Sequence, residues 1–244
     1  MHVDHLLQTG TVGLVDTPEA EPLLRELKAN YDGRLDFILN THHHWDHTGG
    51  NKEIKAATHC KIIGPRRDGE IDGIDKAVGE GDEFKFGDLT VKVVDLPGHT
   101  KGHVGYHFPE ANVFFCGDTL FVLGCGRMFE GTKDQFWSTL QKIRNLPKDT
   151  VMFCAHEYSQ SNAKFARFID PTNECLKEAS EVIDAMRKRG EPTVPSMLVD
   201  ELNCNPFLRV DNEAIQKRAA ELTGTEAVSL SDVFAQVRLL KDSF

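Results

Sequence analysis

Thr41-His42-His43-His44-Trp45-Asp46-His47 follows directly after residues 37–40, three apolar residues and Asn40, which predict a short buried strand. Alternate side chains of an extended backbone leave on the same side, so His42, His44 and Asp46 share one face. His47 joins them if the chain turns at the glycine pair 49–50. Imidazole and carboxylate groups gathered in this way are typical ligands of divalent metal ions, so the stretch predicts a metal site at a strand end.

The alternative is an exposed polar loop that is rich in histidine by chance. The chain has 11 histidines among 244 residues. At that frequency, three histidines and one aspartate with this spacing arise by accident about once in a thousand such sequences. The spacing therefore favours a metal site and predicts further ligands downstream.

The composition is that of a globular protein, with 40% hydrophobic and 27% charged residues. A helix that spans a membrane needs about 20 apolar residues in a row, and the sequence has no such run. The net charge of −10 argues against nucleic acid as the main partner, because phosphate binding needs a basic surface. An anionic substrate would need a local basic patch.

The six cysteines contain no Cys-x-x-Cys pair and form no compact framework, which favours free thiols in a reducing compartment. The N-terminal residues show no targeting pattern. We therefore expect a cytoplasmic protein, with a mitochondrial location as the alternative if the N-terminus is incomplete. We also expect a monomer.

Periodicity predicts a mixed α/β body over residues 1–170 and a smaller helical part over residues 171–244. Thr17 is the expected N-cap of the first helix, and residues 68–81 are an expected loop. The expected strands are a hairpin over 3–16, then 37–40, 61–64, 83–86, 89–95, 104–108, 113–116, 150–154 and 197–202. The expected helices cover 18–30, 51–57, 134–145, 173–189, 212–222 and 231–241.

Three later strands also end in a side chain that can bind a metal: His99, Asp118 and His156. Each alone is more typical of an ordinary turn residue or a hydrogen-bonded histidine. Together with the first stretch they make seven ligands, enough for two ions. We predict that one ion binds His42, His44 and His99. The other would bind Asp46, His47 and His156, with Asp118 bridging both because a carboxylate has two oxygen atoms.

The remaining histidines are expected on the surface or behind the ligands: His2, His5, His43, His59, His103 and His107.

These motifs resemble the metallo-β-lactamase superfamily and, within it, the glyoxalase II (hydroxyacylglutathione hydrolase) family. The resemblance rests on residues 41–47, Gly98-His99-Thr100-Lys101-Gly102-His103, Gly117-Asp118-Thr119-Leu120-Phe121 and His156-Glu157-Tyr158. It extends to Asn205-Pro206-Phe207-Leu208-Arg209 and Val237-Arg238-Leu239-Leu240-Lys241-Asp242 near the C-terminus. It implies an αββα sandwich over residues 1–170, without the family's first strand, and a helical glutathione-binding domain over residues 171–244.

The resemblance implies hydrolysis of S-D-lactoylglutathione and other S-(2-hydroxyacyl)glutathiones to the hydroxy acid and glutathione. Two divalent ions are expected, zinc first, with iron or manganese as alternatives. Metal binding lowers the pKa of water from about 15.7 to about 7, so a bridging hydroxide can attack the thioester carbonyl. Asp118 would hold the ions together, and Asp46 would accept a hydrogen bond from the hydroxide.

The substrate contacts that the resemblance implies are Arg127, Phe129, Tyr158, Arg238 and Lys241. The family usually has Gly-Lys-x-Tyr-Glu-Gly where this chain has Gly126-Arg127-Met128-Phe129-Glu130-Gly131. Arg127 keeps the charge with another geometry. Phe129 lacks the hydroxyl, so one hydrogen bond of about 1 kcal/mol is lost. From the residues alone, Arg238 and Lys241 are more typical of a solvated helix end.

Three other interpretations fit parts of the pattern. A persulfide dioxygenase of the same superfamily would use a single iron, and it predicts neither a second ligand set nor the helical tail. A lactonase or β-lactamase would give the tail no role. A non-catalytic metal-binding member of the fold would keep the ligands without turnover. Metal analysis paired with a thioester assay distinguishes these alternatives.

Overall fold

The structure is a computed structural model that describes residues 10–244. The first half of the hairpin predicted over residues 3–16 lies outside this range. The chain divides into two compact units, the first ending at Gly117 and the second beginning at Asp118. Each unit is described by itself below.

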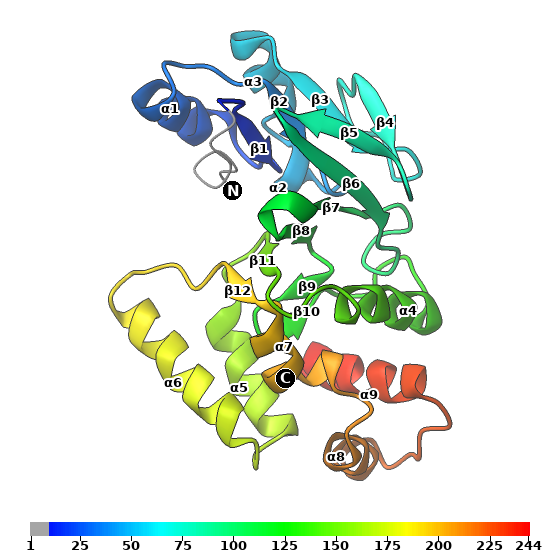
Figure 1. The fold of residues 1–244 in the computed structure, drawn as a ribbon. Coiled ribbons are helices and arrows are strands. Elements are labelled where there is room, and N and C mark those ends of the chain that lie inside the picture. Colours follow the sequence, from blue (N-terminus) through cyan, green and yellow to red (C-terminus); the bar gives the residue numbers. More distant parts are fainter. Residues whose placement is uncertain (1–9) are drawn as a thin grey trace. The chain divides into compact units, whose positions relative to one another are not determined.

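The described part of the first unit, residues 10–117, forms two sheets and three α-helices (Figure 1). The first sheet is parallel with strand order β1-β2-β3-β4, and β5, β6, β7 and β8 pair in sequence as an antiparallel meander. Its elements are β1 (Gly13–Val15), α1 (Ala20–Asn30), β2 (Phe37–Leu39), α2 (Trp45–Thr48), α3 (Asn51–Thr58), β3 (Lys61–Pro65), β4 (Lys76–Val78), β5 (Glu83–Phe86), β6 (Leu89–Asp95), β7 (Val104–Phe108), the 3-10 helix η2 (Pro109–Ala111) and β8 (Val113–Gly117).

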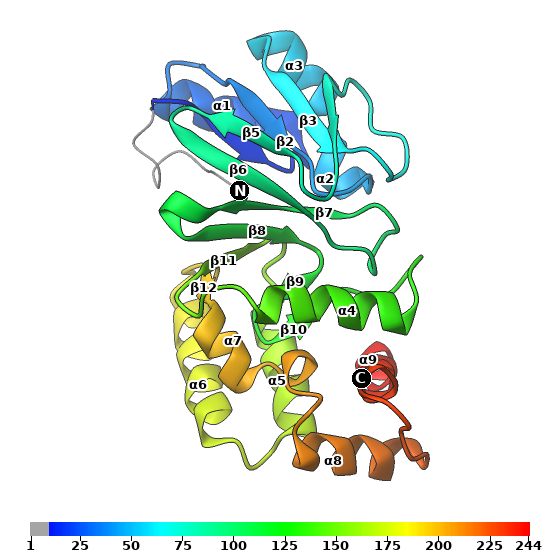
Figure 2. The ribbon, with the colours of Figure 1, turned by 45° about the vertical axis from the view of Figure 1, so that its right-hand side comes forward.

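The two sheets of this unit pack face to face (Figure 2). The rings of Phe37 on β2 and Phe86 on β5 lie 5.8 Å apart, and the Tyr106 hydroxyl of β7 donates to the Asn40 carbonyl at 2.6 Å. Helices α1 and α3 cover the other face of the parallel sheet. Their apolar residues Leu27 and Ile54 belong to the same buried cluster as strand residues of β1, β2 and β3. Both sheet faces are therefore buried, which agrees with the short, wholly apolar strand β2.

Two local predictions for this unit are wrong. Thr17 does not cap the first helix, because α1 begins at Ala20 and its N-cap is Glu19. The Thr17 hydroxyl donates instead to the Asn51 side chain. The expected loop over residues 68–81 contains the edge strand β4, which follows Asp75. The Asp75 carboxylate accepts from the Ile62 backbone N–H at 2.7 Å and thereby holds β4 against β3.

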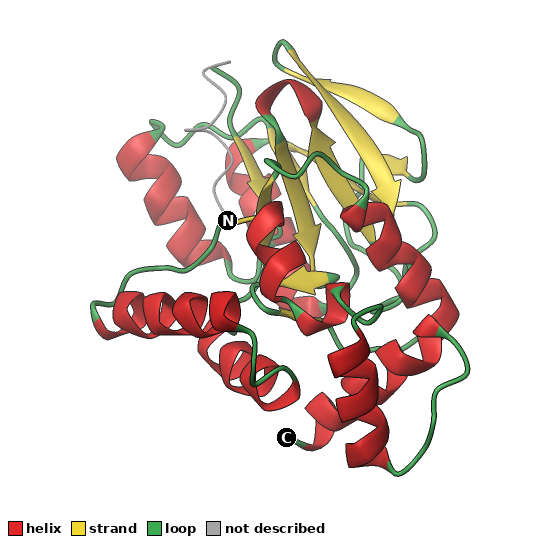
Figure 3. Cartoon of the chain, turned by 60° about the horizontal axis from the view of Figure 1, so that its bottom comes forward, coloured by secondary structure: helices red, strands yellow, loops and turns green. Residues whose placement is uncertain are grey.

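The second unit is mainly helical (Figure 3). Strands β9 and β10 form an antiparallel hairpin, and β11 pairs with β12, also antiparallel. Among residues 10–244, no helix is long and apolar enough to cross a membrane. The elements are β9 (Leu120–Phe121), β10 (Gly124–Cys125), α4 (Lys133–Arg144), β11 (Val151–Cys154), α5 (Ser159–Ile169), α6 (Glu174–Lys188), β12 (Ser196–Met197), α7 (Leu198–Cys204), the 3-10 helix η3 (Pro206–Leu208), α8 (Glu213–Thr223) and α9 (Leu230–Ser243).

Side-chain caps explain where most of these helices begin. Thr132 and Gln135 form a capping box at α4, and Ser229 and Asp232 form another at α9. Asn173 caps α6. The strand predicted over residues 197–202 is wrong: β12 ends at Met197, and residues 198–204 are helical. Helix α5 was not predicted.

The division into compact units at Gly117 differs from the predicted functional boundary at residue 170. The predicted boundary reflects the change from mixed strands and helices to an almost purely helical pattern. That change is visible in the structure, since only β12 lies after residue 170 among the described strands. The boundary at residue 170 stays a prediction about function.

Candidate metal centre

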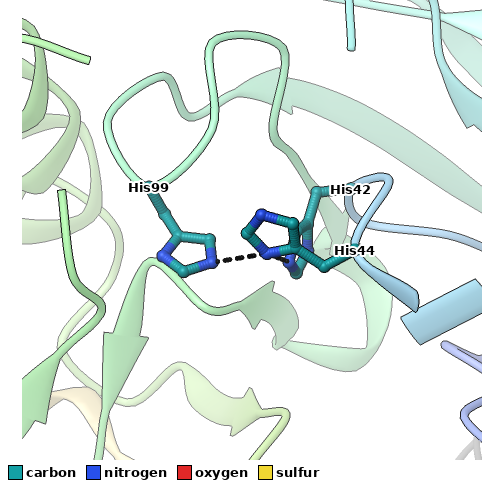
Figure 4. A group of neighbouring side chains, drawn as sticks. All are labelled: His42, His44 and His99. Atoms are coloured by element: carbon teal, nitrogen blue, oxygen red, sulfur yellow. Dashed lines mark hydrogen bonds between the residues drawn. The ribbon is translucent and has the colours of Figure 1, made fainter. Parts of the chain in front are cut away.

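Three histidine rings of the first unit converge on one point (Figure 4). His42 and His44 follow β2, and His99 lies in the loop after β6. Nδ1 of His44 lies 3.0 Å from Nε2 of His42 and 3.1 Å from Nε2 of His99. One ring nitrogen from each residue lies within 4.8 Å of the other two, which is close enough for a single ion. This part of the predicted ligand set is brought together.

The environment of His42 keeps its ring neutral. Burial lowers the pKa of His42 well below the ordinary value of 6.5, and repulsion from neighbouring histidines, His103 first, lowers the pKa further. His42 is fully buried, and its Nδ1 atom lies 3.0 Å from the Thr41 hydroxyl, which leaves Nε2 facing the other two rings. Neutral imidazole is the form that binds metal.

The chain turns directly after His44, because helix α2 begins at Trp45. The prediction that it turns at the glycine pair 49–50 is wrong. The backbone is therefore not extended through Asp46, which together with His47 lies on α2. The Asp46 Oδ2 atom is 3.7 Å from Nε2 of His47, and the His47 ring lies 4.0 Å from the ring of His42. Gly49 has another role: a Cβ there would lie 2.7 Å from the Pro18 carbonyl oxygen, so only glycine allows this close approach.

Sequence patterns did not identify Asp16 as part of this site. Asp16 directly follows β1 and has a positive φ of 59°. Its Oδ1 atom accepts from the Thr41 backbone N–H at 2.8 Å, and its Oδ2 atom lies 2.8 Å from both the Thr41 hydroxyl and Nδ1 of His47. This contact holds the His47 ring so that Nε2 faces Asp46. The available signal was that Asp16, like the predicted ligands, is a metal-competent residue at a strand end.

Asp68 is a second residue that the sequence patterns missed. Its side chain is fully buried. One carboxylate oxygen accepts from the His43 backbone N–H at 2.7 Å, and the other accepts from the Gly102 backbone N–H at 3.2 Å. Because His43 lies between two candidate ligands and Gly102 lies three residues after His99, Asp68 ties together the two loops that carry the three-histidine cluster. The Nδ1 atom of His43 is also 3.0 Å from Asp68.

The other histidines occupy different places. His103 is fully buried and its ring stacks on that of His42 at 4.8 Å. His107 is half-buried, and burial lowers its pKa. His59 is exposed at the end of α3, in the left-handed conformation. His2 and His5 lie outside the described residues.

Two further candidate ligands, Asp118 and His156, lie close together in the second unit. Nε2 of His156 is 3.4 Å from Oδ1 of Asp118, and Asp118 is buried. The ring of Tyr158 stacks on the His156 ring, with centroids 4.8 Å apart and an interplanar angle of 11°. Half of the Tyr158 side chain is exposed. The imidazole and carboxylate groups of this pair and of the three-histidine cluster are the donors of zinc, iron and manganese sites, which suggests metal binding.

Three of the predicted substrate contacts form a cationic group in the second unit. Arg127 is exposed, and its Nε atom is 3.4 Å from an Asp242 carboxylate oxygen. Arg238 is only 5% exposed; it donates to the Cys125 carbonyl at 2.8 Å and to Asp242 at 3.1 Å. The Lys241 ammonium is 3.1 Å from the Ser161 hydroxyl, and burial lowers its pKa.

These contacts give the cations different roles. Arg238 donates its hydrogen bonds to groups inside the protein, among them the backbone carbonyls of residues 125 and 126, and so supports this segment. Arg127 and Lys241 are the more accessible of the three. Phe129, the residue without a hydroxyl at the family's tyrosine position, is 61% exposed.

Comparison with known proteins places the chain in a family. Residues 7–156 match the metallo-beta-lactamase superfamily, and residues 157–244 match the hydroxyacylglutathione hydrolase C-terminus. The chain is 49% identical to a hydroxyacylglutathione hydrolase of Rhodospirillum rubrum, over 97% of this chain and 91% of that protein. It is 47% identical to the protein of the same name from Methylococcus capsulatus, with the same coverage.

A solved structure supports the fold over the whole length. The crystal structure of ETHE1 from Myxococcus xanthus matches with a TM-score of 0.64 over 99% of this chain and 92% of that chain, at 21% identity. At that identity the likeness concerns the fold alone. Because the sequence relatives are far closer and extend through the helical tail, the chain belongs to the hydroxyacylglutathione hydrolase family, with the metallo-beta-lactamase fold followed by that family's C-terminal helical domain.

Proposed function

We propose that this protein hydrolyses the thioester of S-(2-hydroxyacyl)glutathiones, S-D-lactoylglutathione above all, to the hydroxy acid and glutathione. The observation that carries the proposal is the convergence of His42, His44 and His99 in a chain of this family. A persulfide dioxygenase is not favoured, because the relatives at 47–49% identity are named hydroxyacylglutathione hydrolases.

The proposed centre holds two divalent ions, zinc first, with iron or manganese as alternatives. His42, His44 and His99 would hold one ion, while Asp46, His47 and His156 would hold the other, with Asp118 shared. Covalent geometry supports the role of Asp118. A Cβ on Gly117 would lie 2.6 Å from the Thr41 hydroxyl and 2.7 Å from Nε2 of His103, so the end of β8 lies against the histidine cluster. The trans peptide bond places the Asp118 Cα atom about 3.8 Å from that of Gly117.

The residues around the centre suit this chemistry. Bound divalent ions would make hydroxide available near neutral pH and stabilise negative charge on the carbonyl oxygen. Burial keeps His42 neutral, Asp16 fixes the orientation of His47, and Asp46 can accept a hydrogen bond from the attacking water. The leaving group is a thiolate, which needs no strong general acid to depart.

The cationic group of the second unit supports a glutathione substrate. Arg127 and Arg238 both pair with Asp242, and Lys241 lies near enough to both arginines to be affected by their charge, so three cationic side chains gather at one place. Glutathione carries carboxylates, and the protein as a whole has a net charge of −10. We propose that Arg127 and Lys241 contact the substrate directly, that Tyr158 donates its hydroxyl and that Phe129 lines the substrate. Arg238 would hold the segment before Arg127 in place, within a glutathione-binding part over residues 171–244.

The test compares two histidine variants with the same substitution. His44→Asn removes the central imidazole of the cluster, whereas His59→Asn changes an exposed histidine in a left-handed position that asparagine adopts readily. Metal content and hydrolysis of S-D-lactoylglutathione are measured for both. We expect His44→Asn to lose bound metal and at least about 100-fold in kcat/KM, while His59→Asn keeps both. A folded His44→Asn protein with unchanged metal content and hydrolysis would refute the proposed function.

A further inference from the structure

Two cysteine thiols meet between α6 and α7 of the second unit. The sulfur atoms of Cys175 and Cys204 lie 3.1 Å apart, although both cysteines are free. Cys175 lies in the first turn of α6, and Cys204 is the last residue of α7. Formation of a disulfide needs an approach of only about 1 Å, since the S–S bond measures about 2.05 Å.

Hydrogen bonds beside each cysteine hold the two helix ends together. The side chain of Asn173, the N-cap of α6, donates to the Asn203 carbonyl at 3.0 Å and accepts from the Leu176 backbone N–H at 3.1 Å. Asn173 therefore links the residue before Cys204 to the residue after Cys175. The two helix ends that carry the cysteines are therefore tied to each other beside the thiols.

The two thiols differ in access to solvent. Cys175 is exposed, whereas Cys204 is 1% exposed and burial raises its pKa. The other four cysteines are buried. Burial raises the pKa of Cys125 to about 11 and that of Cys154 to about 12, so these thiols stay protonated and unreactive at neutral pH.

We propose that Cys175 and Cys204 form a site of reversible oxidation, at which a hydroperoxide converts the thiol pair into an intrachain disulfide. The Cys175 thiolate attacks the peroxide oxygen, which gives a sulfenic acid and releases hydroxide from hydrogen peroxide. The Cys204 sulfur then attacks the Cys175 sulfur, an S–S bond forms, and water leaves. In sum, two thiols lose two protons and two electrons, and one hydrogen peroxide becomes two waters. A thiol reductant reverses the bond by exchange.

The position of the pair decides what the bond would hold. Cys204 precedes Asn205, whose amide nitrogen donates to the carbonyls of Phe121 at 3.2 Å and Gly124 at 2.9 Å. A disulfide would fix the end of α7, and with it this support of the β9–β10 hairpin, to the first turn of α6. The inference does not depend on the proposed hydrolase activity.

The experiment treats the reduced full-length protein with hydrogen peroxide, blocks the remaining thiols with an alkylating reagent and digests with trypsin without reduction. The peptides 168–177 and 190–209 each contain a single cysteine, Cys175 and Cys204. We expect mass spectrometry to find these two peptides joined with the loss of two hydrogens, and to find them separate after treatment with dithiothreitol. Cys60, in a buried position of the first unit, should be recovered alkylated after denaturation.

The variants make the outcome decisive. Cys204→Ser should accumulate a sulfenic acid on Cys175, trapped by dimedone, and should form no joined peptide. Cys175→Ser should leave Cys204 unmodified, because its burial prevents direct attack on peroxide. The proposal is overturned if Cys175 of the wild-type protein proceeds to sulfinic acid without the joined peptide, stays unmodified, or pairs with a cysteine other than Cys204.

Discussion

The Nδ1 atom of His47 lies 2.8 Å from the Oδ2 atom of Asp16, and both side chains are buried. The same carboxylate binds the backbone N–H and the hydroxyl of Thr41, the residue before the first candidate ligand. The Asp16 carboxylate thus sets the ring orientation of His47 and also fixes the backbone at Thr41, where the histidine-rich stretch begins. Carboxylate partners of this kind fix the tautomer of a metal-binding histidine.

Asp16→Asn should weaken metal binding by about 10- to 100-fold. The amide nitrogen of asparagine would face Nδ1 of His47 and force that atom to accept, which places the ring proton on Nε2 and removes the lone pair needed by the metal. The measurement is metal affinity by competition with a chromogenic chelator. Asp36→Asn is the matched control, because Asp36 also accepts from a backbone N–H, that of Val12, at 2.8 Å, and it has no histidine partner among the described residues. Equal metal affinities for folded Asp16→Asn and Asp36→Asn would contradict this role.

Arg127→Ala should raise KM for S-D-lactoylglutathione about 3- to 10-fold and leave kcat nearly unchanged, because an exposed ion pair contributes about 1 kcal/mol to ground-state and transition-state binding alike. Steady-state kinetics of Arg127→Ala and of a control variant checks this. The control is Lys164→Ala, which removes a positive charge from the exposed face of α5. If the two variants show the same KM, Arg127 does not contact the substrate.

The buried carboxyl of Glu201 should make stability depend on pH. Burial raises the pKa of Glu201 from 4.5 to about 7, while its Oε2 atom accepts from Leu123 N–H and the Asn205 amide, each at 2.9 Å. Because the folded pKa is the higher one, this contribution to stability is fully present below the unfolded value and is lost as pH rises towards 7. The loss is on the order of 3 kcal/mol, since one pKa unit corresponds to about 1.4 kcal/mol.

Urea unfolding between pH 4.5 and pH 8 tests this expectation. Glu201→Gln, which cannot ionise, should show a flatter dependence of the free energy of unfolding on pH than the wild-type protein. Glu178→Gln, on the exposed face of α6, should behave like the wild type. Parallel curves for the wild type and Glu201→Gln would show that Glu201 does not titrate in this range.

Local patterns in the sequence predicted most strands and helices, and they placed the candidate ligands at strand ends. The strand over residues 37–40 and the helix over residues 51–57 were predictable because apolar periodicity is a local property. Thr17 was mistaken for a cap because its partner, Asn51, lies 34 residues away. Residues 198–204 were mistaken for a strand because a short amphipathic helix and a half-buried strand look alike over a few residues.

The supporting residues of the site could not be predicted for the same reason. Asp16 and Asp68 act through residues 25 to 34 positions away in the sequence, and no local spacing reports such contacts. The family resemblance implied that Arg238 contacts the substrate, and its position near a helix end suggested a solvated cation. Its burial against the Cys125 carbonyl depends on how α9 packs, which the sequence pattern does not specify.

The most direct test of the central claim is metal reconstitution. The protein is stripped with a chelator and titrated with zinc, iron or manganese, and bound metal and hydrolysis of S-D-lactoylglutathione are measured on the same samples. We predict that hydrolysis is absent in the stripped protein and rises with bound metal up to about two ions per chain. A folded protein that carries its full complement of metal and leaves the thioester intact would contradict the proposed function.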